Sequence, residues 1–365
     1  MDKRIDPWSA DGTDITDYDK LMKEFGIEPF SDVMKDVPVV HRYMRRGIIY
    51  GHRDFRRIAQ AMKNKKPFIM LTGLMPSGKM HLGHKMVADE MVYFQEMGAH
   101  CYVCVADVEA YLTRGMDAKT MKELAVNEYL LNYIALGLKP ERCTFYFQSD
   151  FVNDYNVLSK YFAKKVTFNE LRAIYGELTT GKIVSALTQA ADILYPQIDM
   201  GKPTPTVVPV GTDQDPHLRL TRDIAARFKS EYNFILPSST YHKYQKGLTG
   251  AKMSSSDPTT YIALTDTRKD VESKVKRALT GGRDTLEEQK RLGGQPQKCT
   301  IFDLYKFHLV DDDAELGRIY DECASGKIMC GECKKRCIDY TARFLEEHQK
   351  KREKAKEQID KFLVK

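Results

Sequence analysis

Four short apolar runs, separated by segments of helical length, place the strongest limit on how this chain can fold. Polar residues or glycines bound them, as expected of buried strands, and they cover residues 67–71, 101–106, 144–147 and 206–210. Segments with the apolar spacing of helices lie between and after them, at residues 82–97, 118–136, 155–175 and 214–229. Because alternating strands and helices favour parallel pairing, the pattern predicts an α/β fold with a doubly wound parallel sheet.

The two ends of the chain differ from this central pattern. Residues 1–65 are polar and broken, which predicts an N-terminal extension that is partly helical. After about residue 265 the spacing becomes helical throughout and the helix faces are charged. We therefore expect three parts: the extension at 1–65, an α/β domain at 66–265 and an α-helical domain at 266–365.

Composition limits the setting in which the chain can work. Its net charge of +6 over 365 residues is mild, so it agrees with an acidic partner such as RNA without requiring one. The longest apolar runs, such as residues 102–106, are too short to cross a bilayer, and the first residues lack the apolar segment of a signal peptide. Eight cysteines without an export signal indicate a reducing compartment. We expect a cytoplasmic protein with no membrane partner.

A glycine-containing loop follows the first apolar run and ends in the string His-Leu-Gly-His at residues 81–84. Within it Gly73, Gly78 and Lys79 begin a P-loop pattern. Met80 stands where that pattern needs serine or threonine to hold magnesium, so the sequence excludes a P-loop.

The string itself begins the predicted helix at residue 82. The N–H groups and the dipole at a helix N-terminus favour anions, and both His81 and His84 can donate hydrogen bonds to phosphate oxygens. Gly83 has no Cβ, so an adenine or ribose ring can lie against its backbone. The alternative is structural: the two histidines cap the helix.

A second string, Lys-Met-Ser-Ser-Ser at residues 252–256, lies 171 positions after the first. The surrounding residues, 247–258, are rich in glycine and serine and predict a mobile loop. Lys252 is a flexible point charge suited to a leaving pyrophosphate, and Ser254 and Ser255 add hydroxyl donors. The alternative is an ordinary polar loop.

In this order and at this distance, the two strings resemble the HIGH and KMSKS signatures of class I aminoacyl-tRNA synthetases. Other segments resemble tryptophanyl-tRNA synthetases, at residues 189–194, 208–214, 217–218 and 220–225. Further ones are similar to the archaeal and eukaryotic branch of that family, at residues 5–8, 17–21, 213–216, 264–266, 281–288 and 346–349. The resemblance covers nearly the whole chain.

The resemblance implies a Rossmann-like catalytic domain, an α-helical anticodon-binding domain and a homodimer whose surface lies in a helical insertion at about 115–180. It implies a ligase that joins tryptophan and ATP, with Mg²⁺, to tryptophanyl-adenylate and pyrophosphate, and then transfers tryptophan to its tRNA. The catalytic residues it implies are His81, His84, Lys252 and Ser254. The ATP-binding residues it implies are Gly73, Ser77, Gly83, Gly211, Asp213, Met253 and Ser255.

The expected tryptophan pocket combines features of two branches of the family. A buried indole offers one N–H donor, and a carboxylate would read it. Asp192 matches the indole-reading aspartate of the bacterial type, whereas Glu109 matches a glutamate of the eukaryotic type, and the sequence leaves both open. Gln189 and Gln214 match positions that hold the amino or carboxylate group of the substrate.

The sequence departs from the family at two pocket positions. Leu71 replaces a tyrosine of the eukaryotic enzymes and of tyrosine enzymes, and Cys104 replaces a glutamine of the eukaryotic enzymes. The loss of tyrosine at residue 71 speaks against a tyrosine–tRNA ligase, which is the main alternative. A small-metabolite adenylyltransferase would not need the helical domain, and an inactive RNA-binding paralogue would not need both signatures.

Four cysteines in the helical part, Cys299, Cys323, Cys330 and Cys333, have a spacing that includes one C-x-x-C pair. Four thiolates can hold zinc or a 4Fe-4S cluster, and the spacing resembles a cluster motif of some tryptophanyl-tRNA synthetases. The alternative is that they pack as small apolar residues, and Cys337 leaves the ligand count open.

Overall fold

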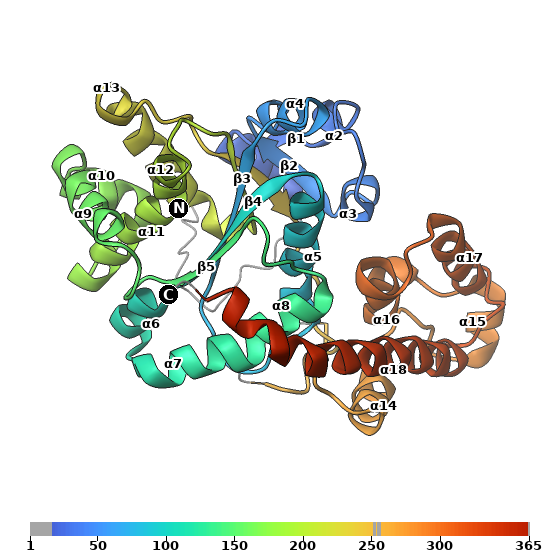
Figure 1. The fold of residues 1–365 in the computed structure, drawn as a ribbon. Helices are drawn as coiled ribbons and strands as arrows, with labels where there is room; N and C mark the ends of the chain where they lie inside the picture. Colours follow the sequence, from blue (N-terminus) through green and yellow to red (C-terminus); the bar gives the residue numbers. More distant parts are fainter. Residues whose placement is uncertain (1–16, 251–252, 254–256, 364–365) are drawn as a thin grey trace.

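The central feature of the computed structural model is a seven-stranded sheet (Figure 1). The structure describes residues 17–250, 253 and 257–363. From one edge of the sheet to the other, its strands are β1 (Glu28–Pro29), β2 (Ile49–Arg53), β7 (Ser238–His242), β6 (Thr206–Val210), β3 (Phe68–Leu74), β4 (Ala99–Val105) and β5 (Cys143–Phe147).

The five strands from β7 to β5 pair parallel with one another, which confirms the predicted core of the fold. The four apolar runs found in the sequence are β3, β4, β5 and β6. Alternate residues of β3 enter two different apolar cores: Phe68 and Met70 pack on one face of the sheet, and Ile69 and Leu71 on the other. Burial on both faces explains why these strands are continuous apolar runs.

The N-terminal extension is a part of the same sheet rather than an appendage to it. Its strands β1 and β2 pair antiparallel, and β2 pairs antiparallel with β7. The wholly parallel sheet expected from the sequence is therefore corrected at this edge. The helices of the extension are α1 (Tyr18–Phe25), α2 (Ser31–Met34), α3 (Arg42–Arg45) and α4 (Arg56–Lys63).

Helices cover both faces of the sheet (Figure 1). After the extension they are α5 (Leu82–Glu96), α6 (Asp107–Arg114), α7 (Ala118–Leu124), η1 (Ala125–Leu130), α8 (Leu131–Leu136), α9 (Asn153–Phe162), η2 (Ala163–Lys165), α10 (Phe168–Tyr175), α11 (Thr180–Asp199), η3 (Thr212–Gln214), α12 (Asp215–Arg227) and α13 (Lys229–Tyr232). The segment 115–180, expected as a helical insertion, also contains the edge strand β5. No helix in the described part of the chain is long and apolar enough to cross a membrane.

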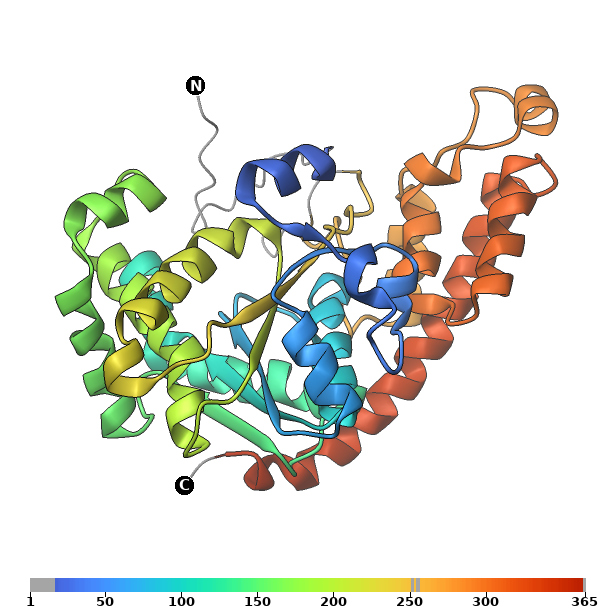
Figure 2. The ribbon, with the colours of Figure 1, turned by 90° about the horizontal axis from the view of Figure 1, so that it is seen from above.

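The described residues after 265 are helical, as expected. They form α14 (Arg268–Arg277), α15 (Leu286–Leu292), η4 (Pro296–Lys298), α16 (Thr300–Leu304), η5 (Tyr305–Leu309), α17 (Asp313–Ala324), α18 (Cys330–Ala355) and η6 (Lys356–Lys361). The first of these project to one side as a separate lobe, whereas α18 runs back along the α/β part (Figure 2). Its end packs on α8, and Leu363 forms a bridge to Phe145 of β5.

Candidate active site

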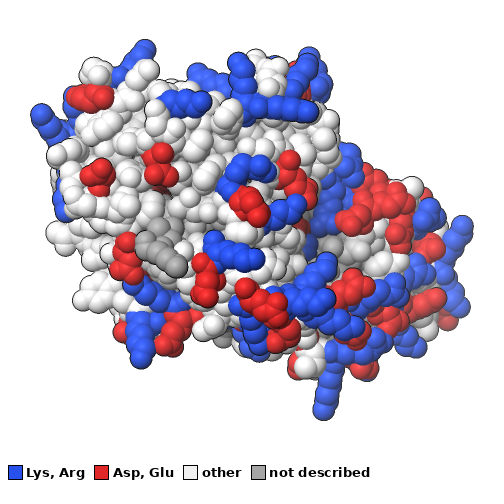
Figure 3. Space-filling model, viewed as in Figure 1, with Lys and Arg blue, Asp and Glu red and all other residues white. Residues whose placement is uncertain are grey.

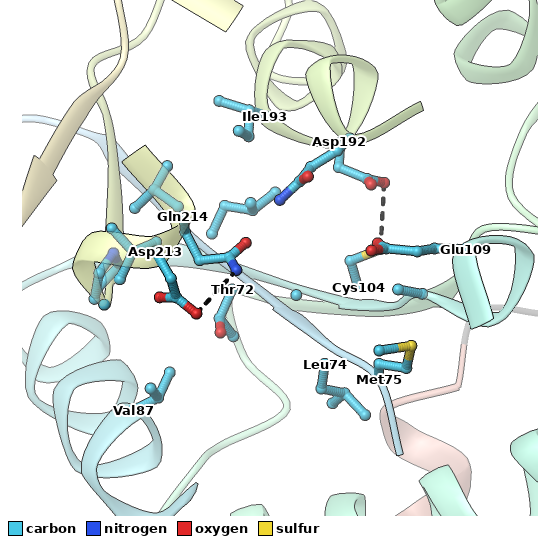
Figure 4. A pocket seen from close by; sticks show the side chains of 18 of the residues that line it. Thr72, Leu74, Met75, Val87, Cys104, Glu109, Asp192, Ile193, Asp213 and Gln214 are labelled. Atoms are coloured by element: carbon cyan, nitrogen blue, oxygen red, sulfur yellow. Dashed lines mark hydrogen bonds between the residues drawn. The ribbon is translucent and has the colours of Figure 1, made fainter. Parts of the chain in front are cut away.

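A pocket of about 690 Å³ lies at the carboxyl ends of β3, β4 and β6, where open α/β sheets bind their ligands (Figure 4). It brings together predicted residues from distant parts of the chain. Those that line it are Leu71, Gly73, Ser77, Cys104, Glu109, Gln189, Asp192, Gly211, Asp213, Gln214 and Met253. Lys252, Ser254 and Ser255 lie outside the described residues.

His81 and His84 cap α5, as the structural alternative expected. The backbone N–H of Gly83 donates to His81 Nδ1 at 3.1 Å, and the backbone N–H of His81 donates to His84 Nδ1 at 3.3 Å. Burial lowers the pKa of His81 to about 2, with His84 as a further cause, and burial lowers the pKa of His84 to about 4. Both rings are therefore neutral near pH 7 and carry their proton on Nε2, which leaves each ring one donor. Capping and anion recognition are thus compatible in these two side chains.

The start of α5 is joined to the segment that follows the second signature. The N–H of Leu82 donates to the carbonyl of Ile262 at 3.0 Å, and the N–H of Leu264 donates to the carbonyl of Met80 at 2.9 Å. A Cβ on Gly83 would lie 2.9 Å from the His81 ring and 3.0 Å from Met253 Sδ. Glycine at residue 83 permits this close approach. The space over its backbone, which the sequence assigned to an adenine or ribose ring, contains the His81 ring and the Met253 side chain.

The loop after β6 carries Gly211 and Asp213, the two residues that the sequence assigned to ATP, and both line the pocket. Tyr244 OH donates to Asp213 Oδ1 and fixes that carboxylate. A Cβ on Gly211 would lie 2.6 Å from Tyr244 OH and 2.8 Å from Asp213 Oδ1, so only glycine fits. Gln214 Nε2 donates to Asp213 Oδ2 at 3.4 Å (Figure 4).

Asp192, on α11, is the most completely bonded acid of the pocket. Its Oδ1 accepts hydrogen bonds from Cys104 Sγ at 3.2 Å, Tyr146 OH at 2.9 Å and Tyr155 OH at 2.7 Å. Its Oδ2 accepts a bond from Gln148 Nε2 at 2.7 Å. Burial raises the pKa of Asp192 to about 6, although these four donors oppose the rise. Oδ2 accepts only the Gln148 bond among the described residues, so it retains capacity for a further donor.

The other predicted pocket residues lie around this carboxylate. Leu71 supplies an apolar wall from β3, and Cys104 turns its thiol toward Asp192 (Figure 4). Gln189 lies one helical turn before Asp192, and its buried Oε1 has no hydrogen-bond partner among the described residues. An unpaired buried amide oxygen suits a ligand N–H donor such as an ammonium group. Glu109 lines the same pocket from α6.

The four predicted cysteines meet in the helical lobe. Cys299, Cys323, Cys330 and Cys333 line one small cavity, and all eight cysteines of the chain are free thiols. Cys337 does not line the cavity. The described residues contain no set of three or more histidine, cysteine or acidic side chains at metal-binding positions.

Comparison with known proteins identifies the family and its fold. The family described as "tRNA synthetases class I (W and Y)" matches residues 62–346. The chain belongs to this family. The Tryptophan--tRNA ligase of Hyperthermus butylicus is 48% identical, covering 99% of this chain and 98% of its own, and that of Methanocaldococcus jannaschii is 48% identical, covering 98% of each. The crystal structure of the tryptophanyl-tRNA synthetase from Aeropyrum pernix has a TM-score of 0.92 at 48% identity, covering 98% of this chain and 99% of its own.

Three side chains that hold Asp192 in this synthetase were missed by the sequence analysis. Gln148 carried a usable signal, because it is the polar residue directly after the apolar run 144–147, at the carboxyl end of β5. Tyr146 lies within that run and reads as an ordinary core residue. Tyr155 reaches the site from α9, a contact that no local pattern in the sequence indicates.

Proposed function

We propose that this synthetase is a tryptophan–tRNA ligase, which activates tryptophan with ATP and then transfers it to the 3′ end of its tRNA. The observation that carries the proposal is the buried Asp192 carboxylate, held by four donors at one end of the pocket. It offers an acceptor to one more N–H group, which is what an indole needs. We assign Glu109 and Gln189 to the ammonium group of the substrate.

The chemistry of the first step follows from the two sides of the pocket. An oxygen of the tryptophan carboxylate attacks the α-phosphorus of ATP, and the bond from that phosphorus to the bridging oxygen breaks, so that pyrophosphate leaves. We assign the Nε2–H groups of His81 and His84 to the phosphates, and Gly73, Ser77, Gly211 and Asp213 to ATP. Magnesium supplies charge neutralisation on the phosphates when bound. We assign Lys252, Ser254 and Ser255 to the leaving pyrophosphate from the sequence alone.

Amino-acid-dependent exchange of pyrophosphate into ATP tests this function. Tryptophan and tyrosine are supplied side by side to the same preparation. Exchange with tryptophan alone is expected, since Leu71 offers no hydroxyl to a tyrosine ring. Exchange with tyrosine would contradict the proposed amino-acid substrate but would agree with the proposed phosphate chemistry. Exchange with neither would contradict the enzyme function.

We propose that residues 266–365 bind the anticodon region and that α18 contributes to RNA contact. Lysine and arginine side chains gather with acidic ones over the helical lobe, whereas the left part of the molecule in the same view, over α9 to α12, carries fewer charges (Figure 3). On α18 the lysines 350, 351 and 354 are exposed. Replacing Lys350 and Lys351 together by glutamate should weaken tRNA binding and reduce its salt dependence, with pyrophosphate exchange unchanged.

We propose a homodimer formed through the surface of α6, α9, α10 and α11. Many of the exposed large apolar side chains of the described residues lie there, which is unusual for a free surface. They are Tyr111, Leu112, Val152, Tyr161, Phe168 and Val184. Phe168→Glu should shift the molar mass in light scattering toward the monomer, whereas Leu286→Glu, equally exposed on the helical lobe, should not.

We propose that the four-cysteine cavity holds a zinc ion or a 4Fe-4S cluster as a structural element of the helical lobe. The support is that four thiols line one space and that Gly282 and Gly294 leave room for two of them. Burial raises the pKa of Cys323 to about 11 and of Cys333 to about 12, so a metal must displace their protons. Metal analysis of anaerobically purified protein tests this, with Cys330→Ser as the variant and Cys143→Ser as the control. Absence of zinc and iron would contradict it.

A further inference from the structure

A buried acid and a histidine face each other beside the nucleotide end of the pocket, in a place where no role has yet been assigned. His242 is the last residue of β7, is 8% exposed and lines the pocket. Glu90, on α5, is 1% exposed. His242 Nδ1 lies 3.3 Å from Glu90 Oε1.

The position of His242 indicates which part of a ligand it meets. In the parallel pair β6–β7, Val210 lies opposite Tyr241, so His242 is level with Gly211. The neighbouring lining residues are Asp213 on the loop after β6 and Val87 on α5. This is the end of the pocket away from Asp192, where ATP is proposed to bind.

The surroundings of Glu90 explain why a carboxylate is buried there. Its other contact is a weak hydrogen bond from Thr240 Oγ1 to Oε2 at 3.3 Å. Among the described residues, His242 is its one cationic or potentially cationic partner within 4 Å. Neither Oε1 of Glu90 nor Nδ1 of His242 has an aligned hydrogen bond among the described residues, so the two atoms face each other at 3.3 Å without other partners. A buried carboxylate is costly unless a donor faces it, so Glu90 favours a proton on the facing Nδ1 of His242. A carboxylate that faces one nitrogen of an imidazole in this way favours one tautomer and one orientation of the ring.

The protonated nitrogen of this imidazole differs from that of the two histidines of the first signature. His81 and His84 accept hydrogen bonds at Nδ1, so their Nε2 atoms are donors. With its proton on Nδ1, His242 presents Nε2 as an acceptor. No hydrogen bond to this Nε2 is present among the described residues, and the ring lines the pocket.

We propose that His242 Nε2 accepts a hydrogen bond from the nucleoside half of ATP, and that Glu90 is the positioning residue that orients the ring. This inference rests on the proposed function. The ligand group is an O–H or N–H donor, which on a nucleoside is a ribose hydroxyl or the 6-amino group of adenine. The ribose hydroxyl and the 6-amino group can each donate one hydrogen bond, and nucleotide analogues that lack one or the other distinguish them.

The test measures pyrophosphate exchange with ATP, 2′-deoxy-ATP, 3′-deoxy-ATP and purine riboside triphosphate, which lacks the 6-amino group. Wild type should lose affinity for one of these analogues. His242→Phe keeps a ring of similar size, and it should raise KM for ATP about five-fold, the usual effect of one hydrogen bond. It should leave KM for tryptophan unchanged. It should also abolish the difference in KM between ATP and the analogue that wild type binds more weakly.

Glu90→Gln should raise KM for ATP less than His242→Phe, because an amide oxygen can still accept from Nδ1. His100→Phe is the matched control, since His100 lies on β4 outside the pocket and bonds to Thr144. An unchanged KM for ATP in His242→Phe, or an analogue penalty that persists in it, would overturn the inference. If the variant fails to fold, an absence of any analogue penalty in wild type would overturn it. Wild-type exchange with tryptophan and ATP tests the proposed function separately.

Discussion

At the scale of single residues, Asp192 has the clearest expected effect. Asp192→Asn keeps the shape but turns an amide N–H₂ toward donors that need an acceptor. It also removes the charged acceptor that we propose for the indole N–H. We expect kcat/KM for tryptophan to fall about 10- to 100-fold, the range for a hydrogen bond to a charged group, with KM for ATP nearly unchanged. Steady-state exchange kinetics measure both. Tyr155→Phe, which removes one of the four donors, should have a smaller effect in the same direction.

The raised pKa of Asp192, about 6, predicts a pH dependence of tryptophan recognition. Above pH 6 the carboxylate is ionised and can accept the hydrogen bond proposed for the indole N–H, whereas below pH 6 a proton occupies one of its oxygens. We therefore expect kcat/KM for tryptophan to fall as the pH drops through 6, and this limb should be absent in Asp192→Asn. The same raised pKa affects folding stability in the opposite direction, because the folded state binds the Asp192 proton more tightly than the unfolded state does. The stabilisation from this proton is therefore full below about pH 4 and is lost as the pH rises through 6.

At the scale of elements, the π-helical turn η1 holds the first signature in place. Glu128 Oε1 accepts the backbone N–H of Met80 at 2.9 Å, and Oε2 pairs with Arg352 of α18 at 3.3 Å. Glu128→Ala leaves that buried N–H unpaired, which costs about 1–3 kcal/mol, and it should slow exchange about ten-fold by displacing His81. Glu128→Gln keeps the acceptor and loses the ion pair, so its rate should stay near wild type. Equal loss in both variants would show that the ion pair dominates.

The same scale explains what the sequence could predict. Strands β3 to β6 were predictable because burial on both faces demands apolar side chains. Strand β7 was not, since its serines, threonine and histidine are buried through hydrogen bonds and contacts that only the folded chain supplies. The two signatures predict a phosphate side from short strings alone. Tyr155 and Gln148 converge on Asp192 from separate elements, and their convergence is a property of the tertiary fold.

At the scale of the whole molecule, three arginines of the N-terminal extension connect the extension with the helical lobe and with α5. Arg46 is nearly buried, and it contacts Asp313 of α17 at 2.7 Å and the carbonyl of Lys306 at 2.6 Å. Arg45 also pairs with Asp313, at 2.9 Å. Arg42 contacts both Asp311 in the helical lobe and Asp89 of α5. The helix that begins with His81 is therefore tied to the lobe proposed to bind the anticodon.

Asp89 is the centre of this connection, and it predicts how the whole protein responds to acid. Burial alone would raise the pKa of Asp89, but Lys85 at 2.6 Å and Arg42 at 2.9 Å outweigh it and hold that pKa well below its usual range. A depressed carboxyl pKa contributes stability that is full above the ordinary value of about 4 and is lost as the pH falls below it. Thermal unfolding between pH 3 and 7 should therefore show a steep acid limb. Asp89→Asn should lower stability at pH 7 and flatten that limb, because it leaves Lys85 and Arg42 without their carboxylate. Asp311→Asn, whose side chain is 87% exposed, should change neither feature appreciably, and an acid limb that persists in Asp89→Asn would assign it to other carboxylates.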